Sequence, residues 1–172
     1  MRIKPTSDGK PCARAFTLIE LILVMTLLVI TTALVAPSLM NFFRGRTLDS
    51  EAQQLLSLTH AGQSRAVSEG EPVLLWVDAK RNAYGLEEET PPAGGDSKAV
   101  TLQLDDSVRV QVENATSTSI TMGNLPAIRF LPGGTIDENS LQSLRLTDAN
   151  GNALWLVESA NHTGYEIRET NQ

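Results

Sequence analysis

The chain has 172 residues, 41% of them hydrophobic and 20% charged, and its 14 Lys and Arg against 20 Asp and Glu give a net charge of −6. Its single cysteine, Cys12, excludes an internal disulfide. An acidic chain repels phosphate backbones on average, so the composition argues against nucleic acid as a partner.

The first 15 residues, MRIKPTSDGKPCARA, form a basic segment with four positive side chains and one negative, namely Arg2, Lys4, Lys10, Arg14 and Asp8. Positive residues in front of an apolar segment stay in the cytoplasm, so we expect the rest of the chain to be exported. A secretory signal has its small-residue cleavage site after the apolar segment, whereas Ala15 comes before it. The pattern therefore predicts a leader that ends ahead of the apolar segment.

Residues 16–36, FTLIELILVMTLLVITTALVA, are apolar enough to cross a bilayer as a helix of about 30 Å. One carboxylate, Glu20, lies near the start of this segment. An ionised Glu in hydrocarbon costs several kcal/mol, which favours a functional partner for it. The alternative is a Glu that reaches back to the lipid headgroups.

Residues Ala15 to Glu20 (AFTLIE), followed by the apolar run and Pro37, resemble the class III signal of type IV pilins and type II secretion pseudopilins. This resemblance implies that a prepilin peptidase cuts between Ala15 and Phe16 and that the new amine of Phe16 is methylated. The family usually has Gly where this chain has Ala15, so slower processing is expected. A generic signal anchor with a chance Glu is the alternative.

Cleavage after Ala15 would place a positive amine on Phe16, about one helical turn from Glu20. In a bundle of such helices, the carboxylate of one subunit could meet the amine of its neighbour. A low dielectric strengthens this pair and makes a missing partner expensive, so Glu20 is predicted to set the axial position of each subunit during assembly.

Pro37 removes one backbone donor and crowds the carbonyl of Ala33, so a kink is expected there, with Thr31 and Thr32 helping to satisfy the freed groups. A plain end of the helix is the alternative. Helical periodicity resumes beyond Pro37, in one weakly apolar stripe of Leu48, Ala52, Leu55, Thr59, Gly62 and Ala66. The small residues of the stripe predict close packing on a sheet, and Gly70 is expected to end the helix.

The chain after Gly70 is divided into short β-like runs separated by turn residues. The predicted strands are 73–78, 83–86, 100–104, 108–113, 127–131, 143–146, 154–158 and 165–168. Residues 87–97 (EEETPPAGGDS) are interpreted as an exposed loop. About a hundred residues with this many short strands favour a single β-sandwich.

Three segments resemble the H-type, GspH/FimT-like branch of the pilin-like family: IRFLPGGTI at 128–136, LRLTDANGNALWLVES at 144–159 and HTGYEI at 162–167. The resemblance implies an α+β fold, with a long N-terminal helix packed on an antiparallel β-sandwich head. The expected divisions are a leader (1–15), a transmembrane helix (16–36), a continuing amphipathic helix (37–69) and a periplasmic head (70–172).

No catalytic residue, metal site or cofactor is expected. His60 and His162 lack a nucleophile motif and are interpreted as parts of a polar helix face and a loop. Asp148, Asn150 and Asn152 around Gly151 look like the start of a calcium loop, but Ser159 stands at the twelfth place, so a hairpin turn is predicted. A second acidic cluster is interpreted as a solvated loop: Glu87, Glu88, Glu89 and Asp96.

Some minor pilins of this branch bind DNA through arginines near the C-terminus, but Arg168 here stands between Glu166 and Glu169. Loss of the leader removes four of the 14 basic residues and one of the 20 acidic residues, which leaves a net charge of −9. Nucleic acid is therefore not expected as a partner.

The resemblance implies a minor pseudopilin at or near the tip of a type II secretion pseudopilus, which supports export of folded proteins across the outer membrane. Its expected partners are other pseudopilins, the prepilin peptidase, an inner-membrane assembly platform and the lipid bilayer. It would cross the inner membrane once, with its head in the periplasm, before entering a periplasmic pseudopilus. The alternatives are a minor pilin of a type IV pilus, involved in pilus initiation or DNA uptake, and a membrane-tethered enzyme.

Overall fold

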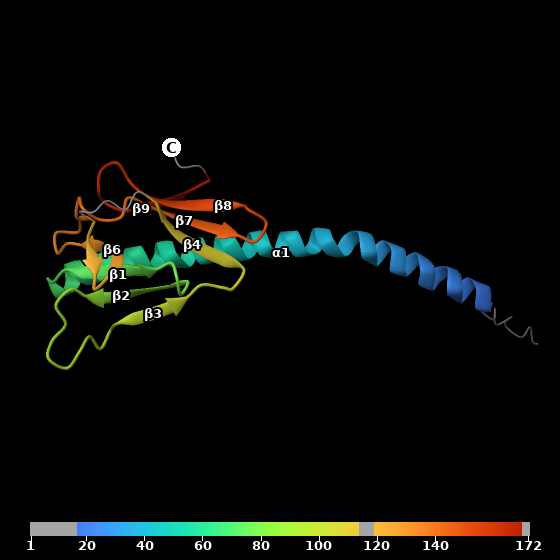
Figure 1. The fold of residues 1–172 in the computed structure, drawn as a ribbon, viewed down its shortest axis with the longest axis horizontal. Coiled ribbons are helices and arrows are strands. Elements are labelled where there is room, and N and C mark those ends of the chain that lie inside the picture. Colours follow the sequence, from blue (N-terminus) through green and yellow to red (C-terminus); the bar gives the residue numbers. More distant parts are fainter. Residues whose placement is uncertain (1–16, 114–118, 170–172) are drawn as a thin grey trace, which may run out of the picture. The chain divides into compact units, whose positions relative to one another are not determined.

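The computed structural model describes residues 17–113 and 119–169, with the side chains of residues 36–45 outside that description. The chain divides into two compact units, with the boundary between Met40 and Asn41. The first contains the beginning of the long helix α1 (Leu18–Glu69), and the second contains the rest of α1 and all the strands (Figure 1).

The second part of α1 buries the predicted stripe. Leu48, Ala52, Leu55, Thr59 and Ala66 are at most 4% exposed, and Gly62 is also buried. A Cβ atom built on Gly62 would lie 2.7 Å from the ring of Phe130 and 2.8 Å from Leu86, so the helix backbone lies close to the sheet. Gly70 then ends the helix with a left-handed φ of 72°, and its N–H donates to the carbonyl of Ala66.

The strands form two antiparallel sheets. The five-stranded sheet has the order β3-β2-β1-β6-β5, and the four-stranded sheet has the order β4-β7-β8-β9. Their bounds are β1 (Val73–Asp78), β2 (Ala83–Glu88), β3 (Val100–Gln103), β4 (Val108–Glu113), β5 (Thr121–Met122), β6 (Leu125–Phe130), β7 (Ser143–Asp148), β8 (Ala153–Glu158) and β9 (Tyr165–Arg168). The predicted fold class, a long N-terminal helix with an antiparallel β head, is confirmed.

Four strand predictions were incomplete, and two of them, for β2 and β7, ended two residues before the observed ends at Glu88 and Asp148. β5 was not predicted, because two residues are too few to show an alternating pattern. β6 begins two residues earlier than predicted and includes Pro126, which sequence rules place outside strands. Pro126 is tolerated because it pairs only with Thr121 of β5, whereas β1 pairs with β6 from Ala127 onwards.

A single apolar core joins α1 to both sheets. It includes Leu55 from α1, Leu75 and Phe130 from the five-stranded sheet, and Leu144 and Leu156 from the four-stranded sheet. The helix therefore completes the core of the head, and the strands cannot bury their inner faces without it.

Asn82 ties the two sheets together at the turn between β1 and β2. Its amide Nδ2 donates to the carbonyl of Val108 at 2.7 Å, and its Oδ1 accepts from the N–H of Val110 at 3.1 Å. Asn82 has a φ of 57°, a left-handed conformation that Asn adopts more readily than most residues. The turn thus satisfies two buried backbone groups of β4 in the other sheet.

Candidate functional site

The first turn of α1 is capped by Thr17. The N–H of Glu20 donates to Thr17 Oγ1 at 3.3 Å, and the N–H of Leu21 donates to the Thr17 carbonyl at 3.2 Å. Glu20 therefore stands where a negative charge is favoured by the helix dipole. The predicted cleavage and methylation positions, Ala15 and Phe16, lie outside the described residues.

The segment Leu18–Val35 has a mean hydropathy of 2.6 and is long and apolar enough to cross a membrane. Every residue in it is exposed. The Glu20 carboxylate is also exposed, and none of the described side chains, those of residues 17–35, 46–113 and 119–169, pairs with it. A partner for this charge would therefore come from outside these residues or from another molecule.

The threonines of this segment satisfy their own hydroxyl groups. Thr26 donates to the carbonyl of Ile22 at 2.8 Å, and Thr32 donates to that of Leu28 at 2.7 Å. Thr31 likewise donates to carbonyls three and four residues earlier. The prediction that Thr31 and Thr32 satisfy groups freed by Pro37 is wrong, because a helical threonine bonds backwards along the chain, and the freed carbonyl lies beyond them.

Pro37 lies inside α1, so it does not end the helix. The α-helical assignment continues without a break from Leu18 to Glu69. The interpretation of Pro37 as a plain terminator is therefore wrong, while the bend expected at this position stays a prediction.

Arg65, near the C-terminal end of α1, organises a network of charged side chains. Its guanidinium contacts Asp96 at 2.7 and 2.9 Å, Glu88 at 2.7 Å and Glu69 at 2.8 Å. The side chains of Arg65 and Asp96 are only 9% and 1% exposed. Hydrogen bonds from Arg65 lower the pKa of Asp96 from 3.8 to about 2, despite the opposing effect of burial.

The interpretation of residues 87–97 as an exposed loop is wrong for its two ends. Glu87 and Glu88 belong to β2, and the side chain of Asp96 is buried against Arg65. Glu89 pairs with Arg129 of β6. Residues 90–95 and Ser97 are exposed, whereas the acidic residues on either side of 90–95 are held by arginines that lie far away in the sequence.

The segment around Gly151 forms the predicted hairpin turn between β7 and β8. The carboxylate of Asp148 accepts hydrogen bonds from the backbone of Asn150 and from the backbone and side chain of Asn152. These contacts use the oxygens that a cation would need. Across residues 17–113 and 119–169, no group of three or more His, Cys, Asp and Glu side chains is arranged to hold a metal ion.

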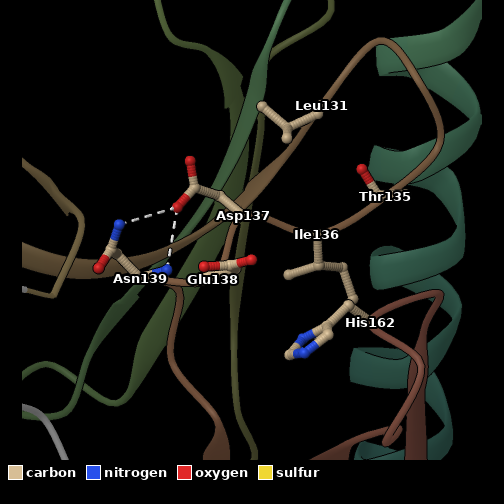
Figure 2. A pocket seen from close by; sticks show the side chains of 7 residues that line it. All are labelled: Leu131, Thr135, Ile136, Asp137, Glu138, Asn139 and His162. Atoms are coloured by element: carbon tan, nitrogen blue, oxygen red, sulfur yellow. Dashed lines mark hydrogen bonds between the residues drawn. The ribbon is translucent and has the colours of Figure 1, made fainter.

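A shallow pocket of about 460 Å³ lies beside the turn after β6 (Figure 2). It is lined by Leu131, Thr135, Ile136, Asp137, Glu138, Asn139 and His162. His162 Nδ1 lies 2.7 Å from the Glu158 carboxylate, which raises the pKa of His162, and Glu138 adds to this effect. The only hydroxyl side chain among these seven lining residues is that of Thr135, and they include no serine or cysteine.

Two arginines of the four-stranded sheet, Arg145 and Arg168, lie beside acidic side chains. Arg145 lies over the ring of Trp155, with 5.3 Å from its Cζ atom to the ring centroid, and 4.0 Å from Glu113. Arg168 pairs with Glu166.

Comparisons with known proteins match both parts of the chain. The family model described as Type II transport protein GspH matches residues 51–161, and that of the prokaryotic N-terminal methylation motif matches residues 10–36. The second match spans the positions of Ala15, Phe16 and Glu20. No curated protein matches the chain in sequence.

Two solved structures of the minor pseudopilin EpsH, from the type 2 secretion system of Vibrio cholerae, resemble this fold. One is 10% identical and covers 74% of this chain and 96% of that chain, with a TM-score of 0.53. The other is 11% identical and covers 70% of this chain and 93% of the solved chain, with a TM-score of 0.49. At these identities the likeness concerns the fold alone. Since the GspH model matches well over half of the residues, including most of the strands, the chain belongs to the GspH family.

Proposed function

We propose that this protein is a minor pseudopilin, a structural subunit at or near the tip of a type II secretion pseudopilus. The observation that carries the proposal is the order of two features in one chain. An N-terminal methylation motif at residues 10–36, which contains the apolar helical segment Leu18–Val35, precedes a GspH head at residues 51–161. In this role the subunit supports export of folded proteins across the outer membrane and catalyses no reaction itself.

The chain first enters the inner membrane, with residues 1–15 in the cytoplasm and the head in the periplasm. The prepilin peptidase then cuts between Ala15 and Phe16, and the new amine of Phe16 is methylated. The methylation motif that spans this site supports the step. Replacing Ala15 with Gly, the residue usual in the family, should speed removal of the leader in a pulse-chase experiment.

The inner-membrane assembly platform then moves the subunit from the bilayer into the periplasmic filament. There the exposed carboxylate of Glu20 pairs with the Phe16 amine of a neighbouring subunit. Loss of one partner from such a pair in a low dielectric costs about 3–5 kcal/mol. The bend proposed at Pro37 lets the anchor and the head follow different directions during this transfer.

A deletion strain complemented with variants of the full chain tests this proposal. We expect the deletion to retain secreted proteins in the periplasm and the wild-type chain to restore secretion. Glu20→Gln should remain in the membrane, yet fail to restore secretion. Glu138→Gln makes the same chemical change at an exposed head residue and is the matched control, so it should restore secretion fully.

Normal secretion in the deletion strain would contradict the proposal. Loss of surface pili or DNA uptake in that strain would instead identify a minor pilin of a type IV pilus. Restoration of secretion by Glu20→Gln would leave the pseudopilin assignment standing and contradict only the role given to Glu20.

A further inference from the structure

The connection between β2 and β3 is longer than the strand pairing requires. These strands are antiparallel neighbours, with Leu86 opposite Val100. Hairpins of this kind usually close within about two to five residues. Here the connection runs from Glu89 to Ala99, and Figure 1 shows it as the light green loop at the lower edge of the head. The sheet itself does not explain the extra length.

The returning side of this loop is fixed to the C-terminal end of α1. Asp96 receives two hydrogen bonds from Arg65, at 2.7 and 2.9 Å, and further ones from the backbone N–H groups of Glu88 and Lys98. The Lys98 ammonium lies 2.6 Å from Glu69 in the last turn of α1. We call these contacts of Arg65, Asp96, Lys98, Glu69 and Glu88 the loop clamp.

The outgoing side is fixed as well. Glu89 pairs with Arg129, and its backbone N–H donates to the carbonyl of Pro72 at 3.0 Å. The part left between the two fixed sides is Thr90–Gly95, which we call the loop tip. A bidentate ion pair between side chains of 9% and 1% exposure is thus used to hold a short surface segment in place.

The loop tip does not itself pack on the head. All six of its residues are exposed. Its hydrogen bond from the N–H of Gly95 to the carbonyl of Pro92, at 2.8 Å, closes a turn within the tip, and Gly95 takes a φ of 83°. The loop clamp therefore does not serve to bury the tip. It fixes the conformation of a segment that remains free to touch another molecule, which lowers the entropy cost of binding.

The chemistry of the tip restricts what it can bind. The sequence Thr-Pro-Pro-Ala-Gly-Gly has no charged side chain, and the cations beside it, Arg65 and Lys98, are already paired with carboxylates. Phosphate and anionic lipid headgroups would find no free positive charge there. The tip also lacks the large apolar side chains that insert into a bilayer. Adjacent prolines expose flat rings and carbonyls, which favour a protein surface lined with aromatic side chains.

We propose that the loop tip is a preformed contact surface for the head of another subunit in the same filament, which receives Pro91 and Pro92 on an aromatic-lined patch. The assignment rests on the proposed function, because it takes its partner from the pseudopilus. The loop clamp holds the tip at the C-terminal end of α1, so the contact lies beside the end of the helix that is farthest along the chain from the anchor.

Site-specific photocrosslinking in cells tests this contact with the full chain. A photoreactive residue replaces Ala93 in the tip, and the control carries it at Ala149, an exposed alanine in the β7–β8 turn. Residue 93 should crosslink to a second filament subunit, and deletion of that subunit's gene should remove the product. Replacing Pro91 and Pro92 with Ser should reduce the yield by roughly tenfold, as expected for a contact that carries much of the binding.

Arg65→Met separates the role of the loop clamp from that of the fold. It should lower the yield at residue 93 and speed hydrogen exchange at the amides of Glu88 and Lys98, which donate to Asp96. Exchange in β1 should stay slow, which would show that the head remains folded.

Crosslinking to filament subunits from residue 149 but not from residue 93 would overturn the proposed contact and leave the pseudopilin assignment intact. Crosslinking of residue 93 only to proteins outside the filament would also overturn it. A chain that crosslinks from neither position, and whose deletion leaves secretion normal, would overturn both the contact and the proposed function.

Discussion

Replacing Asp96 with Asn removes the negative charge that Arg65 holds most closely, and its effect on stability should depend on pH. The folded-state pKa of Asp96 is about 2, against an ordinary value of 3.8. Because the folded pKa is the lower one, the charge stabilises the fold fully above pH 3.8, and this contribution is lost as the pH falls through 2. With about 1.4 kcal/mol for each pKa unit, the shift corresponds to about 2–3 kcal/mol.

The assay is urea unfolding of the full chain in detergent, followed by the fluorescence of Trp76 and Trp155, which both lie in strands of the head. At pH 7 the wild type should exceed Asp96→Asn by about 2–3 kcal/mol in free energy of unfolding. The difference should shrink between pH 4 and pH 2 and nearly vanish at the lower end. A difference that is already negligible at pH 7, or that persists undiminished at pH 2, would refute this reasoning.

Four further substitutions, at three positions, probe the packing of the head in the same assay. Asn82→Gly should cost about 2–5 kcal/mol, since it leaves the Val108 carbonyl and the Val110 N–H unsatisfied. Asn82→Ala should cost about 1 kcal/mol more, because alanine is strained at the φ of 57° that residue 82 adopts. Equal costs would show that backbone strain plays no part. Gly62→Ala should cost about 1–3 kcal/mol, because the new Cβ meets Phe130 at 2.7 Å; an unchanged unfolding midpoint would mean that the ring moves freely. Tyr165→Phe removes the hydroxyl that donates to the buried carbonyl of Leu141 and should cost about 1–3 kcal/mol, and a neutral result would indicate that water replaces it.

The features that the sequence predicted well are those with local patterns. The stripe from Leu48 to Ala66 repeats with the helical period, and Gly70 is a common helix end, so the second part of α1 could be placed correctly. The turn around Gly151 follows from the turn residues alone. Each of these signals is formed by residues close together in the sequence. The interactions that produce the corresponding structure connect the same residues.

The features that the sequence did not predict depend on residues far apart in the chain. Arg65 and Asp96 are separated by 31 residues, and Asn82 is separated by 26 residues from its acceptor on Val108. Neither pairing leaves a periodic or compositional signal. Asp96 in particular stands among Gly, Pro and Ser, and such a composition indicates an exposed loop unless the position of Arg65 is known.

The functional residues of the anchor could be predicted because the resemblance lies in consecutive residues. Ala15, Phe16 and Glu20 fall within six positions of one another, and the methylation motif matches across them. Their roles remain predictions that the proposed experiments address. No resemblance to a family motif was identified in the loop tip. It is a candidate contact surface only because of the buried contacts on either side of it.

The threonine hydroxyls of the apolar segment donate hydrogen bonds to their own helix, and this affects how the anchor would behave in a bilayer. The hydroxyl groups donate to backbone carbonyls of the same helix at three positions, Thr26, Thr31 and Thr32. These side chains therefore offer neighbouring helices mainly their methyl groups. Between Leu21 and Val35 the helix is therefore nearly uniform around its circumference, with little to hold it at one rotation against lipid or a neighbour. In the proposed filament, such an anchor would turn and slide at low cost until Glu20 met its proposed partner, and the folded head would then select the neighbouring subunit.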